Sequence, residues 1–209
     1  MYVDRMDLVA GLDGTTGLEK VTIGLGNKRK EASGFLGQSV LRSYAYPNKF
    51  TVFGQWSSVE DAWVFGANDE LASLIGGITD LAPIQLARFE GYDAVIETDE
   101  DRTLISEARF EQFADWTLSS ISKAADYLQS RQELFALQQS HTPGFVAARL
   151  YRSAGIPTKF LMHTIFRDKS VAQAGGAARE LREFLSSHPA ANYASAPPSI
   201  ETYSVVHRL

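Results

Sequence analysis

The sequence predicts an α+β protein in which two ferredoxin-like domains pack sheet to sheet as an intramolecular pseudo-dimeric α/β barrel. Three observations favour this fold class. The chain contains an internal repeat with a period of about one small domain. Its 209 residues suit two domains of about 100 residues each. Each half also shows a similar succession of strand and helix patterns, which is typical of ferredoxin-like units.

The repeat is clearest between residues 34–50 and 144–160. Seven of the seventeen aligned positions are identical without a gap, and they read Gly-Phe, Arg-Ser, Pro and Lys-Phe in both copies. The same offset, within one residue, relates 90–95 to 201–206. We therefore predict two homologous domains, 1–99 and 100–209.

A β-hairpin is predicted within each copy of the repeat. Residues 35–43 and 145–152 are largely apolar with Val, Leu and Tyr, and each run stops at a turn that contains a proline. Second strands follow at 49–56 and 159–166. Both faces of these strands are largely apolar, so we expect something to be packed on each face of the sheets.

Helices and closing strands are predicted after the hairpins. In the first half, Ser58 with Asp61 three residues later resembles a capping box, and the helix should run from Ala62 to about Leu74. In the second half, the helix should begin near Asp168 or Ser170 and continue through Leu185. The final strands are expected at about 86–95 and 200–207.

The segments that precede the hairpins give a clear helix pattern in the second half and a weaker one in the first. Residues 113–139 read as a strong helix, preceded by a strand at about 103–110. The equivalent stretch 15–33 is a weaker helix, because Gly24 and Gly26 each cost about 1 kcal/mol relative to Ala in a helix interior. It could hold a strand at 20–25 instead. One sheet face in each half should be covered by helices, and the other should be buried against the second copy.

Composition excludes several classes of function. The chain is 44% hydrophobic and 22% charged, with a net charge of −5 and no basic patch, so neither nucleic acid nor a membrane surface is an expected partner. No apolar run is long enough to cross a bilayer. Without cysteine there is no disulfide, thiolate nucleophile or thiolate metal site. The acidic N-terminus does not fit a signal peptide, and we expect a cytoplasmic protein.

The first copy of the repeat reads Gly-Phe-apolar, then apolar-apolar-Arg-Ser, a short turn and a strand ending in Gln55-Trp56-Ser57-Ser58. This succession resembles the antibiotic biosynthesis monooxygenase family. The closing Glu-x-Tyr-x-x-Val strand is similar too. The resemblance covers most of both halves and is weakest over 1–33. It implies a tandem dimeric α/β barrel with a small-molecule pocket in each half, between the sheet and its helices.

The resemblance also implies a range of activities. Some members oxygenate anthrone-like aromatic polyketides without metal or flavin, others open aromatic rings with reduced flavin, and others cleave haem, isomerise metabolites or have no known activity. We therefore expect an oxygenase that combines an aromatic polyketide-like substrate with O₂ in secondary metabolism, with no cofactor, as a monomer or weak homo-oligomer. The alternatives are a reduced-flavin-dependent ring-opening oxygenase and a non-catalytic binding or structural protein.

Trp56 is the catalytic residue that the resemblance implies, because family oxygenases place a Trp at the end of the third strand, where its indole can donate to a substrate oxygen. A core role is the alternative. These oxygenases commonly have an Asn four residues earlier, where this chain has Val52. The second half has Phe166 and Met162 at the two positions, so chemistry is expected in the first half or by a changed mechanism.

Other residues are candidates for binding substrate. Arg42, repeated as Arg152, could bind a phenolate or carboxylate or could have a structural role. Tyr44 and Trp63 could stack on a flat substrate or belong to the core. His163 is expected to be a satisfied buried histidine on the sheet face opposite Phe166, with a general base as the alternative. The four histidines show no ligand spacing, so no metal site is expected.

Overall fold

A computed structural model of the chain describes residues 1–11, 14–67, 85–98 and 102–209. Its contacts divide the chain into unit 1, which comprises Met1–Asp93 and Tyr203–Leu209, and unit 2, which comprises Ala94–Thr202. The strands are hydrogen-bonded in the order β1-β3-β2-β8-β5-β7-β6-β4, which closes into a barrel. This confirms the predicted α+β class with a ferredoxin-like barrel.

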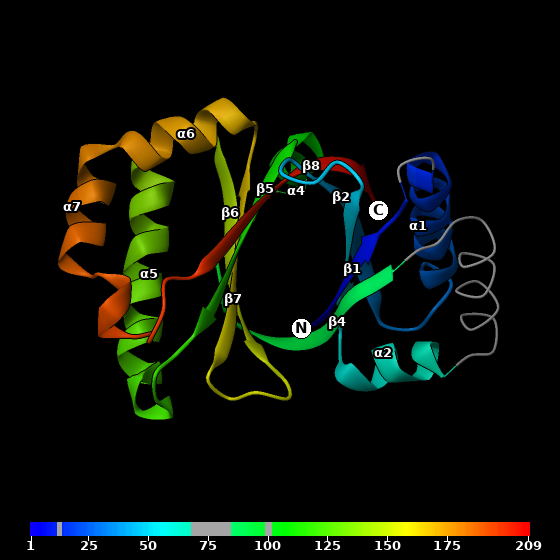
Figure 1. Ribbon diagram of the computed structural model, residues 1–209, viewed down its shortest axis with the longest axis horizontal. Coiled ribbons are helices and arrows are strands. Elements are labelled where there is room, and N and C mark those ends of the chain that lie inside the picture. The colour runs from blue at the N-terminus through cyan, green and yellow to red at the C-terminus, as the bar shows by residue number, and fades with distance from the viewer. Residues whose placement is uncertain (12–13, 68–84, 99–101) are drawn as a thin grey trace. The chain divides into compact units, whose positions relative to one another are not determined.

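The described helices of unit 1 lie on one face of its strands (Figure 1). Its described elements, in chain order, are β1 (Tyr2–Val9), α1 (Thr15–Arg29), β2 (Phe35–Ser43), β3 (Lys49–Trp56), α2 (Val59–Gly66), the first part of β4 (Gln85–Glu97) and the last part of β8 (Ser199–Arg208). β1 pairs antiparallel with both β3 and β4, and β8 returns at the end of the chain to pair with β2.

Unit 2 repeats the pattern. Its described elements, in chain order, are the last part of β4, α4 (Arg102–Glu107), β5 (Phe110–Thr117), the 3₁₀ helix η2 (Ile121–Lys123), α5 (Ala124–His141), β6 (Phe145–Ser153), β7 (Lys159–Phe166), α6 (Lys169–Ala177), α7 (Arg179–Ser187), the 3₁₀ helix η3 (Ala190–Asn192) and the first part of β8. β7 pairs antiparallel with β5 and β6. α5 and α7 lie on one side of these strands (Figure 1).

The predicted hairpins are confirmed as β2–β3 and β6–β7. Each begins at a glycine with a positive φ, Gly34 at 70° and Gly144 at 93°. Since this backbone conformation favours glycine, it explains why both copies of the repeat start with Gly-Phe. The two registers also match, because Arg42 pairs with Phe50 as Arg152 pairs with Phe160.

The predicted helix over 113–139 is confirmed from Ala124 onward, but its start is wrong, and the strand predicted over 103–110 is wrong. Residues 110–117 form β5, which pairs with β7 from Phe110↔Phe166 to Thr117↔Lys159, and α5 begins only at Ala124. Residues 102–107 are helical instead. Pairing along the whole of β7 outweighs the helical pattern of the local sequence, as tertiary context commonly does.

Residues 15–29 form a helix despite their glycines, so the alternative strand at 20–25 does not form. Leu18 and Leu25 bury against the sheet, which offsets the weak propensity. A Cβ on Gly26 would lie 2.4 Å from Leu209 Cδ1 and 2.6 Å from Gln38 Nε2, so this glycine allows α1 to approach the sheet closely.

The helices that follow the hairpins have other bounds than predicted. Ser58 caps α2 by accepting from the Asp61 backbone N–H, as predicted, and the part of the predicted helix beyond residue 67 lies outside the described residues. Asp168 caps α6 in the same way through Val171. The single helix predicted through Leu185 is two, because Ala178 is extended at φ −59° and ψ 137°.

Each unit has a core between its sheet and its helices. In unit 1 it joins Leu18 and Leu25 of α1 to strand residues, namely Met6, Leu8, Val40, Phe50 and Val52. The opposite face of this sheet carries the buried polar residues Arg5, Asp7 and Thr51. The expectation of a bare apolar face is therefore wrong for unit 1.

Candidate functional site

Trp56 ends β3 on the face that α1 and α2 cover. Its side chain is fully buried, with ring centroids 5.3 Å from Phe35 and 5.4 Å from Phe65. The indole N–H therefore cannot rely on water for a hydrogen-bond partner and needs one within the protein.

That partner is Asp4 of β1. Trp56 Nε1 donates to Asp4 Oδ2 at 3.0 Å, and Arg29 Nη2 donates to the same oxygen at 2.9 Å. Asp4 is 5% exposed and Arg29 2%. A buried carboxylate and a buried guanidinium thus compensate each other, and the guanidinium also lies 5.6 Å from the Trp56 ring centroid.

Gln38, which lies on β2, holds the Arg29 guanidinium in place. Its Oε1 accepts from Arg29 Nη1 at 3.1 Å, and its Nε2 donates to the carbonyl of Thr22 at 2.9 Å. The end of α1 and the sheet are therefore joined by a hydrogen-bonded chain that runs from Thr22 through Gln38 and Arg29 to Asp4. Such a chain holds each side chain in one orientation.

Two polar atoms of this group, Asp4 Oδ1 and Arg29 Nε, are buried without a hydrogen-bond partner among the described residues. A Cβ on Gly54 would lie 2.6 Å from Asp4 Oδ1 and 2.2 Å from Arg29 Nη1. Gly54 therefore leaves room for the ion pair. Buried acceptors are normally paired, so an unpaired oxygen on a carboxylate that is held in one position calls for an explanation.

Unit 2 replaces this arrangement with packing. Phe166 takes the place of Trp56 and contacts the rings of Phe110 and Phe145. The strand pair Gln112↔Thr164 of unit 2 is equivalent to the pair Asp4↔Gly54 of unit 1. Gln112 therefore has a neutral amide where unit 1 has the Asp4 carboxylate. The Trp56–Asp4–Arg29 arrangement is a feature of unit 1 alone among these paired positions.

The structure places the other predicted site residues in different surroundings. Val52 lies on the same face as Trp56, fully buried in the unit 1 core. Arg42 donates from Nε to the Pro47 carbonyl at 2.7 Å, as Arg152 does to Pro157 at 3.0 Å, so the repeated arginine bridges the hairpin turn. Tyr44 is 43% exposed and Trp63 is 71% exposed. Of these four residues, only Val52 belongs to the unit 1 core, on the same strand face as Trp56.

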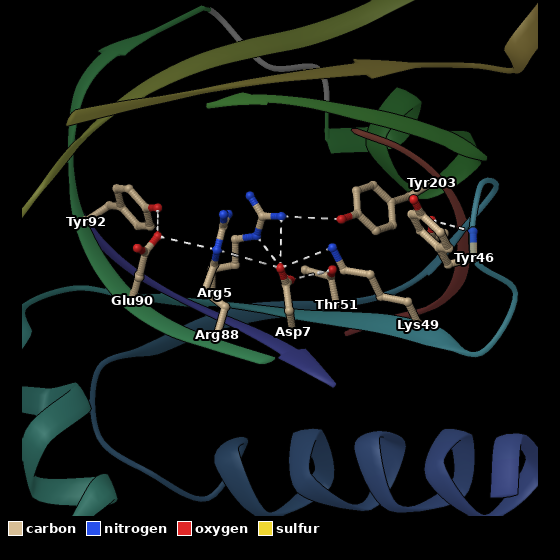
Figure 2. Close-up of polar contacts among 10 residues, drawn as sticks. Arg5, Asp7, Tyr46, Lys49, Thr51, Arg88, Glu90, Tyr92 and Tyr203 are labelled. Carbon is tan, nitrogen blue, oxygen red and sulfur yellow. Dashed lines mark hydrogen bonds and ion pairs between the residues drawn. The ribbon is translucent and has the colours of Figure 1, made fainter. Parts of the chain in front are cut away.

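A second polar network lies on the face of the unit 1 sheet away from α1, and Figure 2 shows it. Arg5 donates to both carboxylate oxygens of Asp7, at 3.1 Å each, and to the Tyr203 hydroxyl at 3.3 Å. Thr51 donates to Asp7 at 2.7 Å, and Lys49 Nζ lies 3.4 Å from it. Asp7 therefore joins β1 to β3 and, through Arg5, to β8.

The same network continues to β4. Arg88 Nε lies 3.9 Å from both Asp7 and Glu90, and the Tyr92 hydroxyl donates to Glu90 (Figure 2). Every carboxylate drawn here has a cationic neighbour, so the network neutralises charge that would be costly on a buried sheet face. We assign it the role of fixing four strands together.

His163 in unit 2 is partnered, as the sequence predicts. It lies 2.7 Å from Glu111, and both side chains are almost completely buried. Phe113 stacks on the imidazole at 4.4 Å. Among the described residues, no three His, Asp or Glu side chains gather as a metal site would require. None of the described helices combines the length and hydropathy needed to cross a membrane.

Sequence reasoning missed Asp4, Arg29 and Gln38. Asp4, Arg5 and Asp7 put charges on both faces of residues 2–9, which hides the alternating pattern of a strand. Each charge is paired in the fold, but its partners can be 25 to 198 positions away. The available signal was the charge-rich pattern itself, since buried charges in a strand require partners.

Comparison with known proteins shows the fold. No protein-family model matches the sequence, and no curated protein matches it. A candidate monooxygenase from Fusobacterium nucleatum subsp. nucleatum is similar in structure, with a TM-score of 0.80, 11% identity, and coverage of 99% of this chain and 93% of its own.

Two other solved structures are similar over nearly the whole chain. An anthrone oxidase-like protein has a TM-score of 0.65 and 14% identity, covering 100% of this chain and 92% of its own. An uncharacterized ferredoxin-fold protein related to antibiotic biosynthesis monooxygenases, from Listeria monocytogenes, has a TM-score of 0.55 and 11% identity, covering 99% and 96%. The chain therefore has the tandem ferredoxin-like fold seen in structures described as monooxygenase-like.

Proposed function

We propose that this protein is an oxygenase that acts on an aromatic, polyketide-like small molecule with O₂, and that the reaction takes place beside Trp56 and Asp4 in unit 1. The observation that carries the proposal is Asp4 Oδ1, which has no hydrogen-bond partner in the part of the chain that the structure describes, while Trp56 and Arg29 hold Oδ2. The names of the similar structures, which include monooxygenase and anthrone oxidase-like, support the reaction class.

The proposed reaction needs a base and surroundings that exclude water. An anthrone or phenol loses a proton to Asp4 Oδ1, and the resulting carbanion passes an electron to O₂. The two radicals combine to a peroxide at that carbon, and loss of water gives the carbonyl. Overall, an anthrone CH₂ and one O₂ become a C=O and one H₂O. The substrate itself supplies the reducing electrons, so the proposed reaction needs neither metal nor flavin.

Each neighbouring residue has a distinct role in this proposal. Trp56 and Arg29 hold Asp4 Oδ2, which leaves Oδ1 as the atom that accepts the proton. Arg29 also places positive charge beside the developing anion, which stabilises it electrostatically. Gly54 lets Asp4 and Arg29 lie close against β3, because a Cβ there would clash with Oδ1 and Nη1, and Gln38 keeps Arg29 in position.

The test is O₂ consumption with an anthrone and with a naphthol, each in the presence and absence of reduced flavin. We expect flavin-independent uptake with the anthrone, and a loss of about 10²-fold or more in Asp4→Asn because the base is removed. Phe166→Leu, at the equivalent position of Trp56 in unit 2, is the control and should keep its activity. Uptake that requires reduced flavin would replace the proposal with the flavin-dependent alternative.

A further inference from the structure

Arg131 of α5 is a buried arginine in an aromatic enclosure in unit 2. Its residue exposure is 1%. The guanidinium carbon lies 5.1 Å from the Trp116 ring centroid, 5.2 Å from Tyr127 and 6.0 Å from Tyr193. These three rings come from β5, α5 and the residue that follows η3, so separate elements converge on this one cation.

No carboxylate among the described residues pairs with Arg131. Its one hydrogen bond is from Nη2 to the neighbouring Ser130 hydroxyl at 2.8 Å, and its Nε has no partner among the described residues. The buried arginines of unit 1 are different, because Arg29 is paired with Asp4 and Arg5 with Asp7. Burial lowers the pKa of Arg131, yet a guanidinium keeps its proton at neutral pH.

Two further donors in the enclosure are unsatisfied. Trp116 Nε1 and the Tyr127 hydroxyl are buried and lack hydrogen-bond partners among the described residues. Burial raises the pKa of Tyr127, so its phenol stays protonated and remains a donor. Tyr127 lies 5.2 Å from Trp116 and 5.7 Å from Tyr193 between ring centroids. The enclosure therefore gathers donors and one positive charge with no anion to receive them.

Cation–π contacts with the rings offset only part of the cost of such a charge. They contribute on the scale of a weak hydrogen bond, whereas an uncompensated buried ion is strongly unfavourable. An organic anion would supply the missing charge and accept from all three residues. Its body would meet apolar side chains of the same core, which include Leu134, Phe160 and Met162.

We propose that Arg131, Trp116 and Tyr127 form a binding site in unit 2 for the carboxylate or phenolate end of an aromatic small molecule. A planar guanidinium matches the two oxygens of a carboxylate, and the surrounding rings match an aromatic body. The site lies between the sheet and α5 of unit 2. It does not depend on the oxygenase reaction proposed for unit 1.

The test is thermal unfolding with benzoate, 1-naphthoate, 2-naphthoate and 2-naphthol at neutral and alkaline pH. Each carboxylate is compared with its neutral carboxamide, and 2-naphthol with its methyl ether, because only an anion should pair with Arg131. We expect at least one anion to raise the melting temperature by several degrees while its neutral counterpart does not, as binding to the folded state requires. If no anion is distinguished from its neutral counterpart, the proposal is overturned.

Arg131→Met is the test variant and Arg179→Met the control, since Arg179 is exposed on α7 and pairs with Glu183. Arg131→Met should lose the anion-specific shift and should unfold, without ligand, at the same temperature as the wild type or higher. Arg179→Met should keep the shift. A purely structural Arg131 would give the opposite pattern, namely a lower melting temperature with the ligand response retained.

Tyr127→Phe keeps the charge and the ring, so it tests the site even if Arg131→Met does not fold. We expect the affinity for the selected anion to fall by about fivefold in this variant, because one donor is removed. An unchanged affinity in Tyr127→Phe, together with anion binding in Arg131→Met, would show that the anion binds elsewhere.

Discussion

Trp56 and Asp4 form a hydrogen bond between the end of β3 and the start of β1, with Nε1 and Oδ2 3.0 Å apart. Because the acceptor is charged and both residues are buried, removing the donor should be costly. We expect Trp56→Phe to lower the free energy of unfolding by about 2 to 3 kcal/mol. Urea denaturation measures this. Equal stability of the variant and the wild type would mean that the hydrogen bond is not formed in solution.

The Asp4–Arg29 pair should show strong coupling. Asp4→Leu alone leaves a buried guanidinium without its carboxylate, and we expect a loss of about 3 to 5 kcal/mol. Asp4→Leu with Arg29→Met removes both charges and should cost less than the sum of the single changes. A double-mutant cycle in urea gives the coupling energy, and additive effects would contradict the pairing.

Gly54→Ala tests the space beside the ion pair. The added Cβ would lie 2.2 Å from Arg29 Nη1, so the guanidinium must move, and we expect lower stability and loss of oxygenase activity. Gly24→Ala is the matched control, since a Cβ there meets nothing within 4 Å. It lies inside α1 and should stabilise the protein by about 1 kcal/mol. A neutral Gly54→Ala would show that Arg29 is not confined.

Asp168 provides a test by pH. Hydrogen bonds from Ser170 Oγ and the Val171 backbone N–H hold the pKa of this carboxyl below its ordinary value. A lowered folded-state pKa stabilises the protein above the unfolded-state pKa, and this contribution disappears as the pH falls through the folded-state value. The melting temperature of the wild type should exceed that of Asp168→Asn above about pH 4, and the difference should vanish in stronger acid. A difference that does not change with pH would contradict this cap.

The hairpins could be predicted from sequence because their determinants are local. Both copies carry a glycine for a positive φ, a turn that contains a proline, and apolar strands on either side of that turn. Because the same succession occurs twice, each copy supports the prediction made for the other. Residues 113–117 of β5 are predicted as the start of a helix because their apolar residues fit either period over a short stretch. Only the pairing with β7 decides between them.

The candidate sites were harder to predict because their contacts join distant segments. The resemblance points to Trp56 as a candidate, but its hydrogen-bond partner Asp4 lies in a strand whose charged residues hide the strand pattern. Arg131 lies four residues after Tyr127 on α5, so their proximity could be read from helical spacing. The sequence could not show that no described carboxylate pairs with Arg131, because that depends on the side chains of β5 and of the residue after η3 that surround it in the fold.

The most direct test of the proposed function is a single-turnover oxidation of an anthrone under isotopically labelled O₂, without flavin or added metal. We predict that the new carbonyl oxygen carries the label, that one O₂ is consumed for each anthrone oxidised, and that Asp4→Asn abolishes the enzymatic rate. Product whose carbonyl oxygen comes from water, or a rate equal to that in buffer alone, would contradict an oxygenase site beside Trp56 and Asp4.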